Sequence, residues 1–251
     1  MIMKEINGSL CEIKMLVASE YGLVVEFGTV ITPEINALAQ YLTQLLISKG
    51  IEGIIEVIPT YRSVMINFDP LCITRFDLSE MIRQTLHEMK PQDIEMLSPK
   101  VVYVPVCYGG VFGPDLDLVS RYTGLSVKEV IEIHTSKPYL VYMLGFTPGF
   151  PYLGGMSEKL AVPRREKPRA KIPKGSVGIG GSQTGFYPIE SPGEWWLIGR
   201  TPVKAFNVNS VNPFLFSAGD YLHFFQITID EYFTIRREVE ANTYIPEVGI
   251  L

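Results

Sequence analysis

Hydrophobic positions in the first ninety residues follow two periods, one typical of strands and one typical of helices. Apolar or alternating runs predict strands at residues 11–18, 22–28, 53–59 and 63–69. Between the two pairs, Thr32 and Pro33 form a helix-start signal ahead of apolar residues at helical spacing. A second helical pattern covers 78–89, and a linker is expected at 90–93. This order predicts an α+β sandwich of the split βαβ (ferredoxin-like) kind over residues 1–95.

Residues 96–251 have a different pattern, in which short helices precede many short strands. A helical insert is predicted at about 114–135, because Ser126 and Glu129 form a capping box inside it. After residue 139, short apolar runs alternate with Gly and Pro turns, and no further helix is expected. The pattern predicts a small β-barrel domain that begins near residue 96.

Composition narrows the possible partners. The chain has 251 residues, 47% of them apolar, and a net charge of −5. An acidic balance argues against nucleic acid as the main ligand, since phosphate binding requires a basic face. No apolar run approaches membrane-spanning length and no leader pattern is present, so we expect a cytoplasmic protein. The three widely spaced cysteines predict no disulfide framework and no zinc site; each is expected to be a small buried hydrophobe, Cys107 included.

The segment 145–202 is the most informative part of the chain. It contains half of the 22 glycines and many prolines, which alone would indicate a flexible linker. Large aromatic residues are interleaved with them, namely Phe146, Phe150, Tyr152, Tyr187, Trp195 and Trp196. A backbone bent by Gly and Pro and anchored by aromatic rings predicts tightly packed loops that face a ligand.

Two glycine-rich turns in this segment are candidate ligand sites, because their backbone amides can donate hydrogen bonds to an oxyanion. The first consists of Gly145, Phe146, Thr147, Pro148 and Gly149. The second runs over 180–185 and includes Gln183, Thr184 and Gly185. The alternative interpretation is that both are barrel-corner turns with no ligand.

Arginines form the one local basic cluster of the acidic chain, at Arg164, Arg165 and Arg169. Arginine binds carboxylate or phosphate in a bidentate manner, so Arg164 and Arg169 are predicted substrate-binding residues. A solvated loop, or one that contacts an acidic partner, is the alternative. Arg62, in the turn between two N-terminal strands, is a further substrate-binding candidate.

His134, Gln183 and Tyr187 are the candidate catalytic residues. His134 ends a helix just before a barrel strand and is the best titrating candidate, although a helix-end interaction would also explain it. Gln183 and Thr184 could hydrogen-bond a planar amide, and Tyr187 could donate its hydroxyl; turn-capping hydrogen bonds are the alternative. His87 and His223 are expected to lie on a helix surface and in a packed strand.

Long ordered motifs resemble those of one family. They are HTSKPYLVYMLGFTPGFPYLGGM from His134, PRREKPR from Pro163, IPKGSVGIGGSQTGFYPIESPGEWWLIGRTP from Ile172 and PTYRSVMINFDP from Pro59. In this order they resemble the allophanate hydrolase subunit 1 family, which includes the B-type subunit of bacterial 5-oxoprolinase and an inhibitor of a sporulation sensor kinase. The family commonly has two glycines before the tryptophan, whereas this chain has Gly193, Glu194 and Trp195, which could narrow or charge the turn.

The resemblance implies a cyclophilin-like β-barrel over 96–251 and work within a complex. It implies a subunit 2 type partner, similar to the C-type subunit of oxoprolinase, and a third subunit similar to sugar hydrolases. Together such subunits open the lactam of 5-oxoproline to L-glutamate with ATP as co-substrate. The chain itself has no phosphate-loop, HExxH or GxSxG motif and no metal-ligand spacing, so it is expected to be inactive alone.

Two other functions remain open from the sequence. The resemblance extends to a regulator that binds and inhibits a sensor histidine kinase, and to subunits that process urea or allophanate amides. Prolyl isomerisation would rest on likeness of fold alone, which does not carry function. The sequence therefore predicts a small amide or lactam as ligand and leaves the enzyme and the regulator as alternatives.

Overall fold

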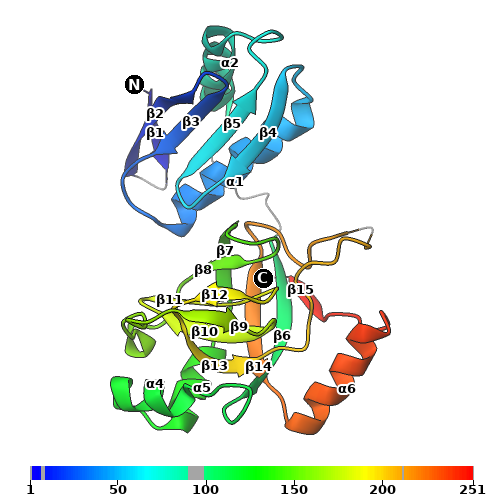
Figure 1. The fold of residues 1–251 in the computed structure, drawn as a ribbon. Helices are drawn as coiled ribbons and strands as arrows, with labels where there is room; N and C mark the ends of the chain where they lie inside the picture. The colour runs from blue at the N-terminus through cyan, green and yellow to red at the C-terminus, as the bar shows by residue number, and fades with distance from the viewer. Residues whose placement is uncertain (1, 7–8, 90–98, 211, 251) are drawn as a thin grey trace. The chain divides into compact units, whose positions relative to one another are not determined.

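A computed structural model of the chain describes residues 2–6, 9–89, 99–210 and 212–250, with side chains from residue 11 onward (Figure 1). The chain divides into two compact units, residues 1–98 and 99–251. The linker expected at 90–93 and the boundary near 95 lie outside the described residues.

The N-terminal unit is an antiparallel sheet with two helices. Its strands are β1 (Ile2–Ile6), β2 (Ser9–Ser19), β3 (Gly22–Phe27), β4 (Ile54–Pro59) and β5 (Ser63–Phe68), in the order β1-β2-β3-β5-β4. Both β3 and β4 pair antiparallel with β5, so these two strands run in the same direction with β5 between them. Joined by α1 (Pro33–Lys49), they form the expected split βαβ connection. The strand that pairs with the outer edge of β3 is β2, which precedes β3 in the chain. In a ferredoxin-like domain the strand at this position comes instead from the chain after the second helix, here α2 (Arg75–Glu88).

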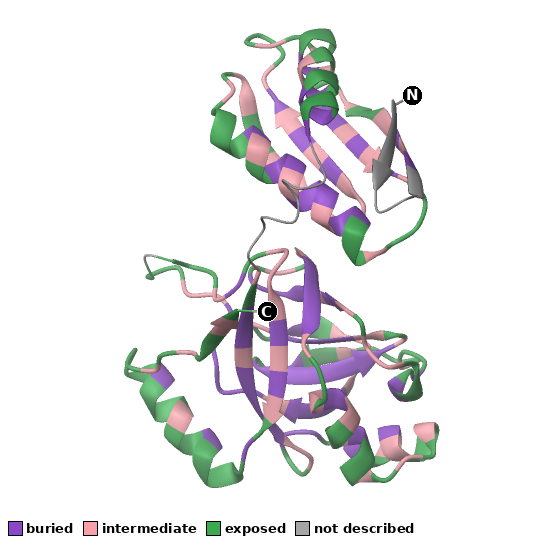
Figure 2. Cartoon of the chain, turned by 180° about the vertical axis from the view of Figure 1, so that it is seen from behind, coloured by how far each residue is buried: buried purple, intermediate pink, exposed green. Residues whose placement is uncertain are grey.

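Local sequence signals account for the two N-terminal helices. Thr32 caps α1 by accepting a hydrogen bond from the Ile35 amide, and Gly50 ends the helix in the left-handed conformation. Thr74 caps α2, which begins three residues before the predicted start at Leu78. Both helices pack their apolar sides on the same core as β3 and β5, where buried residues concentrate (Figure 2).

The C-terminal unit is built on a strongly curved sheet. Its strands are β6 (Lys100–Tyr108), β7 (Tyr139–Leu144), β8 (Pro151–Gly154), β10 (Ser176–Gly180), β11 (Gln183–Phe186), β13 (Trp196–Arg200), β14 (Tyr221–Gln226) and β15 (Val248–Ile250). Among the described residues the order is β11-β10-β13-β6-β14-β7-β8, and β15 pairs with β6. The two end strands of this order, β11 and β8, lie in contact, so the sheet nearly closes into a barrel. A separate pair, β9 (Arg169–Ile172) and β12 (Ser191–Gly193), is antiparallel.

Two short helices form the predicted insert. They are α4 (Leu116–Thr123) and α5 (Val127–Thr135). The capping box is confirmed, because Ser126 and Glu129 satisfy each other's backbone amides at the start of α5. Asp115 occupies the N-cap of α4 but makes no side-chain cap, since its carboxylate is used elsewhere.

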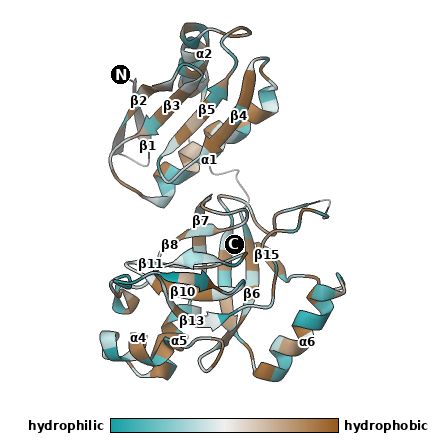
Figure 3. Ribbon diagram, viewed as in Figure 1, coloured by the Kyte–Doolittle hydropathy of each residue, from teal (hydrophilic) through white to brown (hydrophobic). Residues whose placement is uncertain are grey.

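The expectation that no helix follows residue 139 is wrong. The 3₁₀ turn η1 (Glu158–Leu160) and the helix α6 (Ile229–Glu240) both lie beyond it. Helix α6 contains several β-branched residues, which weaken the helical signal, and Figure 3 shows hydrophobic and hydrophilic residues mixed along it. A capping box of Thr228 and Glu231 starts it, and an ion pair of 2.8 Å between Arg236 and Glu240 supports its last turn.

Glycines of the barrel make room for one tryptophan. A Cβ built on Gly180 would collide with the Trp195 ring, and one on Gly185 would lie 3.3 Å from it. The indole therefore lies flat against the backbone of β10 and β11, and only 6% of Trp195 is exposed. Close approach of a ring, and not only turn formation, explains part of the glycine content of this segment.

Gly180→Ala is expected to destabilise the barrel by about 1–3 kcal/mol, because the new methyl group overlaps the buried ring of Trp195. Urea unfolding followed by circular dichroism measures the change. Gly249→Ala is the control, since its Cβ would meet Tyr103 at an ordinary 3.5 Å. Equal unfolding midpoints for the two variants would contradict the role given to Gly180.

Candidate functional site

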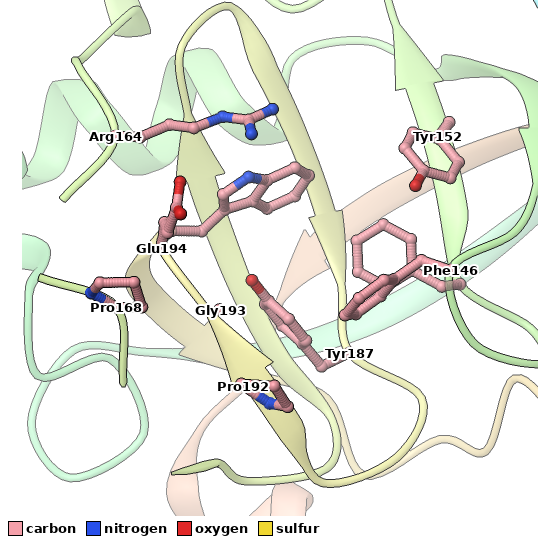
Figure 4. A pocket seen from close by; sticks show the side chains of 10 residues that line it. Phe146, Tyr152, Arg164, Pro168, Tyr187, Pro192, Gly193 and Glu194 are labelled. Atoms are coloured by element: carbon pink, nitrogen blue, oxygen red, sulfur yellow. The ribbon is translucent and has the colours of Figure 1, made fainter. Parts of the chain in front are cut away.

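A concave pocket of about 320 Å³ lies on the barrel unit, between the loops that the sequence singled out. Its lining residues are Phe146, Phe150, Tyr152, Arg164, Pro168, Tyr187, Pro192, Gly193, Glu194 and Trp195. In Figure 4, Arg164 and Glu194 lie on one side, Phe146 and Tyr152 on the other, and Tyr187 between them. We call this cavity the aromatic pocket. Its mostly apolar wall and few polar groups are typical of a site for a small ligand.

Phe150 holds the aromatic wall together. Its ring centroid lies 5.4 Å from those of Tyr152 and Tyr187 and 5.7 Å from that of Trp195. All three contacts are edge-to-face, the geometry in which aromatic quadrupoles attract. The wall is therefore a packed cluster with a defined shape.

The Gly145–Gly149 loop contributes the ring of Phe146 to the pocket wall. The Thr147 amide donates to the Gly145 carbonyl at 2.6 Å, and the Phe150 amide donates to the Thr147 carbonyl at 3.0 Å. These two amides are used locally, and the ligand-binding role of the other amides of the loop stays a prediction. Phe146 has a left-handed φ of 62° and remains 60% exposed at the pocket edge. This conformation is costly for a residue with a side chain, and such strain is frequent at binding sites.

Tyr187 supplies the pocket with a neutral hydroxyl. Burial raises the pKa of Tyr187 to about 12, so the hydroxyl keeps its proton at neutral pH and can donate it in a hydrogen bond. Gly193 leaves space for this hydroxyl, because a Cβ there would overlap the oxygen. The predicted role of Tyr187 as a hydrogen-bond donor is compatible with this position; proton removal by Tyr187 at neutral pH is not.

Arg164 brings a positive charge to the pocket edge. Its Nη2 donates to Oε1 of Gln183 at 3.3 Å, which ties the exposed arginine to strand β11. Gln183 contacts Arg164 through this hydrogen bond and is not itself among the pocket-lining residues. Of the three clustered arginines, Arg164 is the one that lines the pocket.

Arg169 and Arg165 serve the framework. The Nη2 atom of Arg169 donates to Oδ1 of Asp115 at 2.7 Å, and Arg165 lies 3.8 Å from the same oxygen. The other oxygen of Asp115 accepts the Leu197 amide at 2.7 Å. Because Asp115 is 3% exposed, these donors stabilise a carboxylate that burial alone would disfavour. The substrate-binding role predicted for Arg169 is not supported by this placement.

His134 lies inside the barrel, away from the aromatic pocket, and is 0% exposed. Its Nδ1 and Nε2 lie 2.7 Å from the hydroxyls of Tyr108 and Thr184, and Thr184 donates to the Gly178 carbonyl at 3.0 Å. A carbonyl only accepts, so Nε2–H donates to Thr184 and the Tyr108 hydroxyl donates to Nδ1. Burial lowers the pKa of His134 to about 3, so it is neutral at pH 7. The structure argues against the predicted catalytic role of His134 and the ligand-binding role of Thr184.

The remaining candidates also have local partners. The Gly181 amide of the second glycine-rich turn donates to the Val162 carbonyl at 2.7 Å, and Gly185 lies under Trp195. Arg62, in the N-terminal unit, forms an ion pair of 2.9 Å with Glu26 and donates to the Gly28 carbonyl. Its substrate-binding role stays a prediction.

The cysteines behave as expected with one exception. Cys11 and Cys107 are buried, whereas Cys72 is exposed. Burial raises the pKa of the Cys107 thiol, which disfavours the nucleophilic thiolate. Within the described ranges no group of three His, Cys, Asp or Glu side chains is placed to hold a metal ion. The same part of the chain has no helix with the length and hydropathy needed to span a bilayer.

Sequence reasoning did not select Glu194, Tyr152, Phe150 and Trp195 as site residues, although all four line the pocket. Signals for them are present in the sequence. The three aromatics are unusual in a glycine-rich segment, and Glu194 departs from the family motif. Asp115 has only a helix-start signal, because its partners are 54 and 82 residues away.

Comparison with known proteins identifies the class. A family model described as "Carboxyltransferase domain, subdomain C and D" matches residues 13–216. The B-type subunit of 5-oxoprolinase from Bacillus subtilis (strain 168) is 40% identical over 225 residues, which is 86% of this chain and 93% of that protein. The B-type subunit of 5-oxoprolinase from Escherichia coli O157:H7 is 41% identical over 172 residues, 68% of this chain and 78% of that protein.

A solved structure has the same fold. The crystal structure of TTHA0988 superposes with a TM-score of 0.74 at 32% identity over 82% of this chain. The chain spans 40% of the length of that solved protein. The shared fold and the family match over most of the chain together identify the class, a carboxyltransferase domain of the subdomain C and D type. The chain belongs to this family, and the motif resemblance to B-type subunits of 5-oxoprolinase is confirmed.

Asp115→Ala is expected to lower the free energy of unfolding by about 3–5 kcal/mol, since it leaves Arg169 without its buried partner and the Leu197 amide unsatisfied. Urea unfolding of the purified chain measures this. Asp117→Ala, an exposed residue in the first turn of the same helix, is the control. A loss no larger than that of the control would show that Asp115 does not hold this region together.

The stability of the barrel is expected to fall with acid because of His134. In the unfolded chain the imidazole of His134 has a pKa near 6.5, whereas in the folded barrel its pKa is about 3. Between these values the unfolded chain binds a proton that the folded barrel does not bind. The contribution is therefore complete above pH 6.5 and is lost as the pH falls, at up to about 1.4 kcal/mol per pH unit. Urea unfolding between pH 7.5 and 5.0 should show a shallower dependence for His134→Gln than for wild type. His87→Gln, outside the barrel, is the control; an unchanged slope in His134→Gln would refute the assignment.

Proposed function

We propose that the chain is the B-type subunit of a 5-oxoprolinase, the hydrolytic enzyme that opens the lactam of 5-oxoproline to L-glutamate. The observation that carries the proposal is the match to 93% of a B-type 5-oxoprolinase subunit at 40% identity. The aromatic pocket agrees with it, since its volume of about 320 Å³ suits a small ring. Under the same proposal the barrel is cyclophilin-like, and the N-terminal unit is a variant of the ferredoxin-like type in which β2 replaces the strand after α2.

In this proposal the aromatic pocket holds and orients the substrate. Arg164 pairs with the carboxylate of 5-oxoproline, and the Tyr187 hydroxyl donates to the lactam carbonyl oxygen. That hydrogen bond strengthens as the oxygen gains negative charge during attack on the carbonyl carbon, which favours the transition state. The ring of Phe146 covers one side of the substrate and limits the access of water.

The proposal includes partners that complete the reaction. A subunit 2 type protein, similar to the C-type subunit of oxoprolinase, and a third, sugar-hydrolase-like subunit would supply the groups that the aromatic pocket lacks, including the site for ATP as co-substrate. The polar pocket groups Arg164, Glu194 and Tyr187 suit binding and orientation. A protein with this set of groups is expected to be inactive alone and to act in a cytoplasmic complex.

Two other functions stay predictions. The description of the family as a carboxyltransferase domain favours transfer to, or hydrolysis of, a urea-type amide as the second candidate. Inhibition of a sensor histidine kinase is the third. Assays of the assembled complex with urea and allophanate, and of a purified kinase with this chain, address them.

Reconstitution tests the proposed function. The chain mixed with its subunit 2 type partner, the third subunit and ATP is expected to release glutamate from 5-oxoproline, whereas any pair of subunits is not. Release by the other two subunits alone, at the same rate, would reject a role for this chain.

Tyr187→Phe in the assembled complex is expected to lower kcat by about 100-fold, because it removes a donor to the developing oxyanion and keeps the ring contacts. Initial rates of glutamate release measure it. Tyr122→Phe, which removes a hydroxyl from an exposed ring away from the pocket, is the control. A Tyr187→Phe complex as active as this control would exclude the proposed hydrogen bond.

A further inference from the structure

Two opposite charges share the wall of the aromatic pocket without neutralising each other. Both Arg164 and Glu194 line it, on the same side in Figure 4. Arg164 donates to Gln183, and in the described ranges 11–89, 99–210 and 212–250 no ion pair joins it to Glu194. The anion Asp115, by contrast, is fully engaged with Arg165 and Arg169. The pocket therefore presents one cation and one anion that are both available to a ligand.

The Glu194 carboxylate is presented by a fixed backbone. The Glu194 carbonyl accepts a hydrogen bond of 2.9 Å from the Arg165 amide. The next residue, Trp195, is held against Gly180 and Gly185, and the preceding Gly193 lies at the end of β12. Glu194 itself is half-buried, so its carboxylate is presented to the pocket from a backbone of defined position.

Both charges act on the same place in the pocket. Burial has the largest effect on the pKa of Tyr187, and Arg164 lowers this pKa while Glu194 raises it. The residues that carry the hydroxyl, the guanidinium and the carboxylate all line one pocket, whose wall also includes Phe150 and Trp195. Glu194 is half-buried beside the aromatic wall, so a ligand that displaces water from its carboxylate without offering a donor costs free energy. A ligand with an anionic group for Arg164 and a hydrogen-bond donor for Glu194 satisfies both charges.

We infer that Glu194 is a specificity-determining residue, which accepts the N–H of a cyclic amide while Arg164 pairs with the ligand's carboxylate. The inference rests on the proposed function and adds a selectivity particular to this chain, because the family motif commonly has glycine where this chain has Glu194. A carboxylate can only accept hydrogen bonds. In a ligand with a ring oxygen in place of the N–H, that oxygen would face the Glu194 carboxylate, and no hydrogen bond could form between the two acceptors. The pocket should reject such a ligand although its size and charge are unchanged.

The test compares two ligands of the same shape. Isothermal titration calorimetry measures the affinity of the assembled complex for 5-oxoproline and for the lactone acid in which oxygen replaces the ring N–H. Wild type is expected to bind the lactam about 10- to 100-fold more tightly, the range of one hydrogen bond to a charged group. Glu194→Gln can turn its amide and donate to the lactone oxygen, so its preference should fall close to one. Glu194→Ala should lose the preference in the same way.

Glu190→Gln is the matched control, because Glu190 precedes β12, pairs with Lys171 at 3.3 Å and does not line the pocket. It should keep the wild-type ratio of affinities. An unchanged ratio in Glu194→Ala, or a wild type that binds lactam and lactone equally, would overturn the inference. Glutamate release by the same complexes distinguishes failure of this inference from failure of the proposed function. If the wild-type complex is active and Glu194→Ala keeps the wild-type ratio of lactam to lactone affinity, only the role of Glu194 is rejected. If the wild-type complex is inactive, the proposed function is rejected and this inference with it.

Discussion

A single buried carboxylate fixes the chain segments on which the aromatic pocket depends. Asp115 receives a main-chain hydrogen bond from Leu197 on β13 and a charged one from Arg169 on β9, each 2.7 Å long. Withdrawing a carboxylate from water is unfavourable unless its oxygens are paired, so only a close arrangement of these strands and the start of α4 is stable. The loop that carries Arg164 precedes β9 and is held in place by this pairing. Pocket geometry therefore follows from an interaction that is itself outside the pocket.

Polar residues of the barrel divide into two groups with different tasks. His134 and Thr184 form a closed chain of hydrogen bonds in the interior, in which every donor has an acceptor. A satisfied buried network makes the barrel rigid and leaves nothing for a ligand. Arg164, Glu194 and Tyr187 face the pocket and suit recognition rather than proton transfer. This division is what a binding subunit of a larger enzyme requires, because its own task is to hold a substrate in one orientation.

Short-range signals in the sequence predict the helices well and the site only in part. The caps at Thr32 and Ser126 are encoded within four residues, so the sequence alone identifies them. Helix α6 has the same kind of cap, but the β-branched residues in its interior have low helix propensity, so the helix is not predicted from the sequence. The family motifs locate the loops of the pocket. They do not show that Arg169 pairs with Asp115 or that Gly180 lies under Trp195, since these contacts join residues far apart in the chain.

Phe146 is subject to two opposing demands. Its left-handed φ of 62° is a conformation that glycine adopts without cost, so the stability of the loop alone would favour glycine at this position. The pocket, however, uses the aromatic ring as part of its wall. A mutation to glycine would then gain stability and lose ligand affinity, so a selection for protein yield would favour it and a selection for activity would remove it. Among related sequences, an aromatic residue at this position would therefore indicate a pocket that still binds its ligand, and a glycine would indicate one that does not.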